Sequence, residues 1–427
     1  MLVGIYARQR VSGAYLIQYI ILYSYADFKC FLSAGGEKMT VCGIIAEFNP
    51  LHRGHAALLR AARSGADAVF CVISGNFVQR GDTAVIPKPK RAQAALMCGA
   101  DAVAELPVPW SMSTAQNFAL GGVSQLMALG CDEIMFGSEC GDINELIRAA
   151  QLLESNEICD ELGVQLKKGV SFAAAREAAA ARLGLSSGVL SRPNDTLAVE
   201  YILAAGRLGF NGKFRCFKRI GAAHDSSEEH PLTVSSSAIR ERLKKGDIGF
   251  AERFMPAELR GIISEDIISD ISRLDTAILA VLRSLSKEAF ANLPDISEGL
   301  ENKLYLSVRA SSSFEELCRM VKSKRYSLAR IRRLVLSAFL GIDNRFFGMR
   351  PPYVRILGLS ENGTGHLKKG DIPVLTRAAD IRALGGFAAE VFETECRATD
   401  LYSLSFPTPL WCGAEYKTKL LKTECLK

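Results

Sequence analysis

Long apolar runs and closely spaced cysteine pairs are missing from this chain of 427 residues. Its most apolar stretch near the start, residues 14–23, is about half as long as the ~20 residues that a helix needs to cross a bilayer. The twelve cysteines are scattered, and the absence of any Cys-x-x-Cys pair disfavours a structural metal. Several cysteines lie in apolar, strand-like runs, so we expect reduced thiols in a cytoplasmic protein without a membrane partner.

Disordered and collagen-like classes are excluded by composition, since 48% of the residues are hydrophobic and 23% are charged. The length predicts two or three domains. A net charge of +6 permits a nucleic-acid partner without arguing for one.

Residues 1–38 resemble a signal peptide only superficially, because no small-residue cleavage site follows the apolar stretch. The first predicted strand begins just after a second methionine, Met39. We interpret residues 1–38 as a non-domain extension, which a start codon assigned too early would explain.

Short apolar runs alternate with helix-like segments from residue 41 onward, which predicts an α/β fold with a Rossmann-like parallel sheet. The predicted strands are 41–46, 67–74, 101–106, 131–136 and 214–218. The predicted helices between them are 54–64, 88–98, 114–128 and 143–154, with a helical insertion near 156–190. We therefore expect a five-stranded catalytic domain over 39–248 and a mainly helical, basic region over 249–427.

Two of the five histidines lie in one stretch, His52-Arg53-Gly54-His55, between the first predicted strand and the first predicted helix. Imidazoles three residues apart on a first helical turn face the same side. The helix N-terminus adds free amides and a favourable dipole for an anion. This arrangement predicts phosphate binding in an adenylyl transfer from ATP, although two unrelated histidines at a helix start could give the same pattern.

A second candidate phosphate element is the stretch 234–240, where Ser236 and Ser237 begin a predicted helix and Arg240 follows one turn later. Taken alone, such a stretch is often only a helix N-cap. Beside a His-x-Gly-His motif it fits a second phosphate-binding element, with Arg240 offering a planar fork of donors.

Five sequence blocks resemble the bacterial tRNA(Met) cytidine acetate ligases, which belong to the HxGH nucleotidyltransferase superfamily. The blocks are 45–55 (IAEFNPLHRGH), 73–81 (ISGNFVQRG), 136–139 (FGSE), 192–195 (RPND) and 218–222 (KRIGA). The resemblance implies a ligase that forms acetyl-adenylate from acetate and ATP, and then acetylates N4 of the wobble cytidine of elongator tRNA(Met). AMP and pyrophosphate are the other products.

The same resemblance implies the site residues. His52, His55, Ser236 and Arg240 would be catalytic. The implied ATP contacts are Ile45, Ala46, Glu47, Phe48, Asn49, Pro50, Leu51, His52, Arg53, Gly54, His55, Ala56, Ala57, Leu58, Gly137, Asn194 and Arg219. Arg53 stands where the family usually has a small or polar residue, and Asp195 where we expect a second amide.

Ser74, Gly75 and Asn76 are candidates for the pocket that takes acetate or the reacting base. His224 and His230 bracket an acidic stretch, which we interpret as a polar loop and not as a metal site. Mg²⁺ is expected to accompany ATP, but no carboxylate cluster predicts a dedicated protein site for it.

A basic tract runs from Arg319 to Lys369, with twelve Lys or Arg against only two acidic residues. Phe346, Phe347 and Tyr353 are interleaved with it, a combination typical of RNA binding through phosphates and stacked bases. A solvated helix surface would have a similar composition. The predicted tRNA-binding residues are Arg80, Lys88, Lys324, Arg325, Arg332 and Arg333. For Arg80 and Lys88, contact with ATP phosphates and a plain solvated face stay open as alternatives.

Two other functions stay open at this point: a small-metabolite adenylyltransferase of the same superfamily, and a non-catalytic RNA-binding protein that keeps the fold. The length of the basic C-terminal region argues against the first, and the intact His52, His55 and Arg240 argue against the second.

Overall fold

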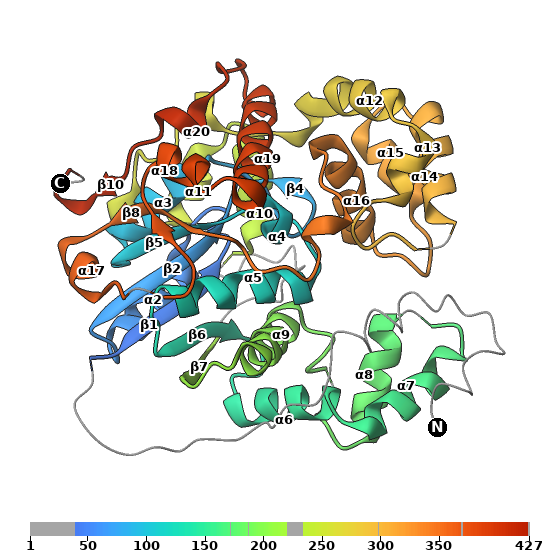
Figure 1. The fold of residues 1–427 in the computed structure, drawn as a ribbon, viewed down its shortest axis with the longest axis horizontal. Helices are drawn as coiled ribbons and strands as arrows, with labels where there is room; N and C mark the ends of the chain where they lie inside the picture. Colours follow the sequence, from blue (N-terminus) through green and yellow to red (C-terminus); the bar gives the residue numbers. More distant parts are fainter. Residues whose placement is uncertain are drawn as a thin grey trace.

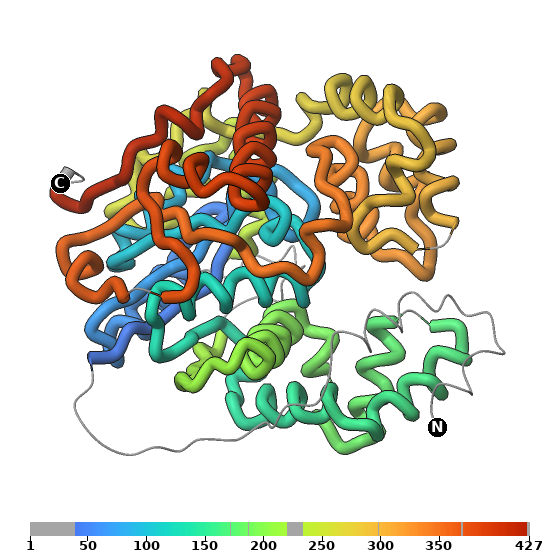
Figure 2. Tube along the Cα trace, viewed as in Figure 1, coloured from blue at the N-terminus to red at the C-terminus, as the bar shows by residue number. Residues whose placement is uncertain are grey.

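The computed structural model describes residues 39–170, 172–186, 188–219, 234–297, 299–368 and 370–425 (Figures 1 and 2). The expectations for residues 1–38 and for His224 and His230 lie outside these residues.

A single large sheet organises the molecule (Figure 1), with the strand order β10-β8-β5-β2-β1-β6-β7. Its five parallel strands are β1 (Val41–Ala46), β2 (Ala68–Ser74), β5 (Ala102–Leu106), β6 (Glu133–Ser138) and β7 (Lys213–Lys218). Numbered along the chain, these five strands have the order 3-2-1-4-5, in which the winding direction reverses between the first and the fourth. The predicted Rossmann-like parallel sheet is therefore confirmed.

Helices cover both faces of this sheet, which explains why its central strands are apolar throughout. Ile45 packs into one buried cluster, and Ile44 beside it packs into another on the opposite face. Helices α5 (Ala115–Ala128), α6 (Ile143–Leu153) and α9 (Pro193–Leu208) cover the first face. Helices α2 (Arg53–Arg63) and α3 (Lys88–Met97) cover the second, together with α10 (Ser236–Lys244) and α11 (Ile248–Phe254).

The predicted helical insertion contains α7 (Asn156–Leu166) and α8 (Phe172–Arg182). Across the part of the chain that the structure describes, no helix is both long enough and apolar enough to span a bilayer. The ten cysteines whose side chains are described are all free thiols.

The region after residue 248 is mainly helical, but it also completes the sheet. Strand β8 (Val354–Leu359) pairs antiparallel with β5, and β9 (Val374–Leu375) and β10 (Leu421–Lys422) pair with β8. A helical bundle lies beside the sheet (Figure 1). It contains α12 (Asp275–Ser284), α13 (Lys287–Ala291), α14 (Leu300–Ala310), α15 (Phe314–Val321) and α16 (Leu328–Leu340).

The remaining elements are short, apart from α19, and the chain supplies them in this order: β3 (Phe77–Val78), β4 (Asp82–Thr83), α4 (Val108–Ser111), α17 (Glu361–His366), α18 (Ala378–Ala383), α19 (Gly386–Tyr402) and α20 (Ala414–Lys417). Short 3₁₀ turns lie at Ala257–Leu259, Glu265–Ile267, Ile271–Leu274, Asn344–Phe346, Ser403–Ser405 and Thr423–Cys425.

A buried ionic cluster joins the C-terminal helices to the sheet. The Lys88 ammonium pairs with Glu105 on β5, Glu395 on α19 and Glu415 on α20, and Arg355 on β8 pairs with Glu105 and Glu415. Lys88 is 1% exposed. The prediction that Lys88 contacts tRNA is therefore wrong, because three carboxylates enclose its ammonium inside the protein.

Lys88→Met should lower the free energy of unfolding by about 3–5 kcal/mol, because it leaves buried carboxylates without their cation. Urea denaturation at pH 7 measures this loss.

Glu395→Gln is the matched control. Burial and the neighbouring Glu105 raise the pKa of Glu395, so of the three carboxyls it tolerates the loss of its charge best, and Gln keeps its shape. The control should stay within about 1 kcal/mol of the wild type. An equal loss in both variants would contradict this account of the cluster.

Candidate functional site

The residues predicted to be catalytic gather where the parallel sheet reverses its winding, at the carboxyl ends of β1 and β6. Open α/β sheets bind ligands at this position, since the loops after the two strands diverge there. The turn that follows β1 carries His52 and His55, and Gly137 lies near the end of β6. Because β1 and β6 are paired in parallel, both segments lie at the same edge of the sheet.

The turn from β1 into α2 is sharply bent, and hydrogen bonds from Val85 and Arg91 stabilise it. Phe48 has a positive φ of 47°, and the Asn49–Pro50 peptide bond is cis. The Asn49 side-chain oxygen accepts a hydrogen bond from the Val85 backbone N–H (2.8 Å). The buried Arg91 guanidinium donates to the carbonyls of Glu47 (2.8 Å) and Ser74 (2.9 Å), so it ties together the ends of β1 and β2.

His52 is the N-cap of α2, and its two ring nitrogens have different partners. Nδ1 accepts a hydrogen bond from the Gly54 N–H (3.0 Å), so in the neutral ring the proton is on Nε2. Nε2 lies 3.0 Å from Ser236 Oγ and therefore donates to it. The Ser236 hydroxyl proton is then available to a ligand oxygen.

His55 lies against His52, as the spacing predicts, with ring centroids 3.9 Å apart and ring planes inclined by 22°. The His55 Nδ1 accepts a weak hydrogen bond from the His52 N–H (3.4 Å), which leaves its Nε2 as the donor. Gly54 allows this packing, because a Cβ there would lie 2.9 Å from His52 Cε1.

Both imidazoles are neutral in this site. Burial, with the positive charges of Arg219 and Arg240, lowers the pKa of His52 to about 3. Burial and the neighbouring His52 and Arg219 also lower the pKa of His55. The His55 Nε2–H and the Ser236 hydroxyl that His52 orients are therefore neutral donors beside fixed guanidinium charges, an environment that favours an anion.

The second predicted phosphate element meets the first. Ser235 is the N-cap of α10, and Ser236 and Ser237 lie in its first turn. The Arg240 guanidinium donates to the Asn49 carbonyl (3.0 Å) and to Ser237 Oγ (3.0 Å). Two segments 184 residues apart in the chain, those of His52 and Ser236, thus share one site.

The end of β6 and the loop after it form another part of the candidate site. A Cβ on Gly137 would lie 3.5 Å from Arg219 Cγ, so Gly137 faces Arg219. The Asn194 amide donates to Glu139 Oε1 (2.5 Å), a partner that the sequence motif contains but to which we assigned no role. Asp195 is fully buried and accepts hydrogen bonds from Ser138 Oγ (2.6 Å) and the Glu139 N–H (2.8 Å), so it supports this loop from inside.

The predicted substrate pocket at Ser74, Gly75 and Asn76 is not supported by the structure. The Ser74 and Asn76 side chains are enclosed by protein. Asn76 accepts from the Lys88 N–H (3.0 Å) and donates to Thr399 (3.0 Å), so its amide fixes the interior below the site.

Four of the six predicted tRNA-binding residues lie in α16 or just before it, and they divide into two groups. Lys324 and Arg325 are exposed in the segment between α15 and α16. Arg332 instead donates a hydrogen bond to the Gly81 carbonyl (2.8 Å), and Arg333 donates one to the Gln79 carbonyl (3.2 Å). These donors therefore bind the protein's own backbone.

Two of the three aromatic residues predicted to stack on RNA bases are buried. Tyr353 is 0% exposed and Phe346 is 3% exposed, so the stacking prediction is wrong for both. Their rings belong to the core that joins the helical bundle to the sheet.

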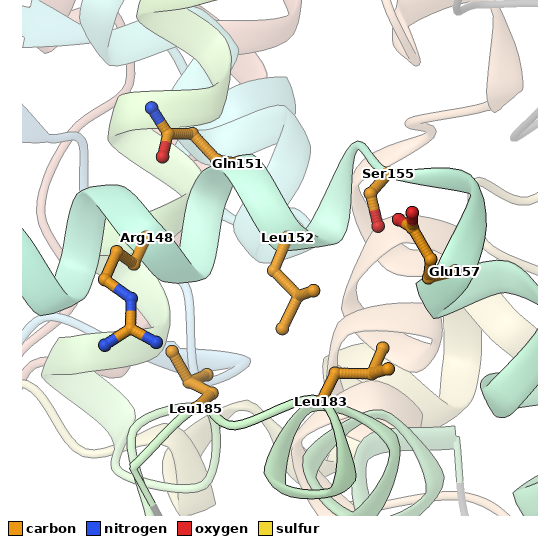
Figure 3. Close-up of a pocket in the computed structure, with 7 residues that line it drawn as sticks. All are labelled: Arg148, Gln151, Leu152, Ser155, Glu157, Leu183 and Leu185. Carbon is orange, nitrogen blue, oxygen red and sulfur yellow. The ribbon is translucent and has the colours of Figure 1, made fainter.

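A hollow of about 300 Å³ lies elsewhere, between the end of α6 and the segment after α8 (Figure 3). Leu152, Leu183 and Leu185 give it an apolar floor, with Arg148 and Glu157 also lining it. None of its lining residues belongs to the predicted site.

Comparison with known proteins places these observations in one family. Residues 39–412 match the family described as HIGH Nucleotidyl Transferase. The tRNA(Met) cytidine acetate ligase of Thermoanaerobacter sp. (strain X514) is 34% identical over 403 residues, which cover 90% of this chain and all of that protein. The Clostridium acetobutylicum enzyme of the same name is 35% identical over 391 residues, covering 86% of this chain and 96% of its own.

Solved structures agree with the sequence comparison. The apo crystal structure of Thermotoga maritima TmcAL superposes with a TM-score of 0.83 at 32% identity, over 90% of this chain and all of that one. The same protein bound with alpha-thio ATP gives a TM-score of 0.82 at 31% identity, with the same coverage.

Gly54→Ala should lower the rate of any reaction at this site at least tenfold, because the new methyl group displaces the His52 ring from Ser236. The free energy of unfolding should stay within about 1 kcal/mol of the wild type, since Ala favours the first turn of α2. Single-turnover kinetics and urea denaturation measure the two effects.

Gly163→Ala is the control, because Gly163 lies in α7 and a Cβ there meets nothing within 4 Å. Unchanged kinetics in Gly54→Ala would show that the His52 position does not matter.

Proposed function

This chain belongs to the HIGH nucleotidyl transferase family, and within it to the tRNA(Met) cytidine acetate ligases. On that premise we propose that it activates acetate with ATP and acetylates N4 of the wobble cytidine of elongator tRNA(Met). The observation that carries the proposal is the hydrogen bond between His52 Nε2 and Ser236 Oγ, which joins two phosphate-binding elements at the switch point of the sheet.

In the first step an acetate oxygen attacks the α-phosphorus of ATP. The bond from the α-phosphorus to the bridging oxygen breaks, and pyrophosphate leaves with the electron pair. Negative charge shifts onto the phosphoryl oxygens, where the donors of His55, Ser236 and the N-terminus of α2 stabilise it. Neutral imidazoles suit this role, because they donate hydrogen bonds without needing to gain or lose a proton near pH 7.

In the second step the N4 amine of cytidine attacks the acetyl carbon of acetyl-adenylate. The bond from this carbon to the AMP oxygen breaks, AMP leaves with the electron pair, and the attacking nitrogen loses one proton. Among the residues that the structure describes, we assign no general base to this step. For a weakly basic amine that attacks a mixed anhydride, the main requirement is correct positioning of the two reactants.

Mg²⁺ accompanies ATP in this proposal as part of the substrate. Among the described residues, the one group of carboxylates close enough to share a cation is Glu105, Glu395 and Glu415, and the Lys88 ammonium already occupies its centre. In this proposal the oxygens of the triphosphate therefore bind the ion, without a dedicated site on the protein.

We propose that the region over 249–427 binds the tRNA, with Lys324 and Arg325 on its exposed surface. Their exposed charges support contact with the phosphate backbone. A tRNA substrate and free thiols also support a cytoplasmic location.

His55→Ala should abolish acetyl-adenylate formation, because it removes one of the two neutral donors at the α-phosphate. The assay combines enzyme, MgATP, labelled acetate and total tRNA, and follows acetylcytidine, AMP and pyrophosphate. The variant should bind tRNA with nearly wild-type affinity in filter binding, and equal loss of both properties would indicate misfolding instead. Transfer of AMP to a mononucleotide by the wild type, with no label in tRNA, would contradict the proposed function.

The double variant Lys324→Ala, Arg325→Ala should weaken tRNA binding and reduce the slope of log K against log salt by about one to two, one for each phosphate that the protein no longer neutralises. Arg182→Ala, in the insertion, is the control, since Arg182 pairs with Glu161 far along the chain from this segment. A salt slope equal to the wild-type value would exclude this segment from the docking surface.

A further inference from the structure

A short hairpin connects the helical bundle to the ATP site. Strands β3 and β4 pair antiparallel and leave Gln79, Arg80 and Gly81 at the tip. Gly81 ends this three-residue loop with a φ of 71°, and its N–H donates to the Val78 carbonyl (2.9 Å). The family resemblance of residues 73–81 does not by itself indicate this shape.

The tip is fixed on the side of the ATP site. The Gln79 N–H donates to Glu47 Oε1 (3.0 Å), and Glu47 directly precedes Phe48 in the bent turn that leads to His52. Next to the tip, the Asp82 carboxylate lies 4.0 Å from the Lys244 ammonium at the end of α10.

The tip is also fixed on the side of the bundle, by α16. Arg333 donates to the Gln79 carbonyl (3.2 Å), and Arg332 donates to the Gly81 carbonyl (2.8 Å). These are the carbonyls on either side of Arg80. The fit is close, since a Cβ on Gly81 would lie 2.6 Å from Arg332 Cβ and 2.7 Å from the Arg333 nitrogen.

Arg80 is the central residue of this tip, between the contact with Glu47 on one side and the contacts with α16 on the other. Burial lowers the pKa of Arg219 and of Arg240, the nearby carboxylates Glu139 and Glu47 respectively oppose this shift, and the positive charge of Arg80 adds to it in both cases. The three guanidiniums therefore lie within electrostatic reach of one another. Glu47, Asp82 and Glu139 offset part of this positive charge. A triphosphate carries enough negative charge and enough oxygens to take all three.

We propose that Arg80 is a third phosphate-binding arginine of the ATP site, and that Arg332 and Arg333 are positioning residues that hold it there from the helical bundle. The inference rests on the proposed function. It assigns the bundle a part in the first chemical step, before any tRNA is bound. It also reassigns three of the residues predicted for tRNA binding to the chemistry of ATP.

Acetate-dependent exchange of labelled pyrophosphate into ATP tests the proposal, because this reaction needs no tRNA. Arg80→Ala should raise the KM for MgATP and lower kcat/KM about 10- to 100-fold, and Arg80→Lys should recover part of the loss. Arg333→Met should show the same kind of KM effect, about five- to twentyfold, and Arg333→Lys should recover part of it through one hydrogen bond to Gln79.

The double variant Arg80→Ala, Arg333→Met separates positioning from general destabilisation. If Arg333 acts through Arg80, the double variant should be no worse than Arg80→Ala within about twofold. Arg309→Met, on α14 of the same bundle, is the control and should exchange at the wild-type rate. Multiplying effects in the double variant would overturn the positioning role, and wild-type exchange by Arg80→Ala would overturn the whole proposal.

Failure of the proposed function has a different signature. If the wild type exchanges no pyrophosphate with acetate, the ligase reaction is excluded, and calorimetric titration with MgATP still tests Arg80. Weaker ATP binding by Arg80→Ala would then support its phosphate contact, and equal binding would overturn it. Loss of tRNA binding alone, with normal ATP affinity, would also overturn it.

Discussion

The hydrogen bond between His52 and Ser236 determines how the site is built. His52 can make it only because Gly54, two residues later, supplies an N–H to its other nitrogen and leaves room for its ring. The bond brings the N-terminus of α2 to that of α10, so two positive helix ends face one volume. Arg240 strengthens the junction from the other element, through the carbonyl of Asn49.

The charges around this site favour an anion, and they do so without protonated histidines. Burial keeps both imidazoles neutral, and the lasting positive charge comes from guanidiniums, which do not lose their protons near neutral pH. Such a site can bind ATP and stabilise its reacting phosphate over a broad pH range. It also explains why two adjacent imidazoles tolerate each other at a ring separation of 3.9 Å.

The mainly helical C-terminal region completes the interior of the fold. It contributes β8 to the sheet, two of the three carboxylates around Lys88, and the α16 arginines that hold the β3–β4 hairpin. A long basic region can therefore serve the interior of the catalytic fold as much as its surface. Net charge alone does not distinguish these uses, because a buried arginine and an exposed arginine contribute equally to the composition.

The sequence by itself determined the parallel sheet, the helix that begins with His-x-Gly-His and the pairing of His52 with His55, since all three depend on local periodicity and on the fixed geometry of a first helical turn. It also indicated the family, through blocks such as 73–81. Only the tertiary structure decided what the basic residues do. Lys88 is enclosed by carboxylates from α19 and α20, and Arg332 and Arg333 bind carbonyls about 250 residues earlier in the chain. Such partners are brought together by packing over long sequence separations, for which local sequence patterns contain no signal.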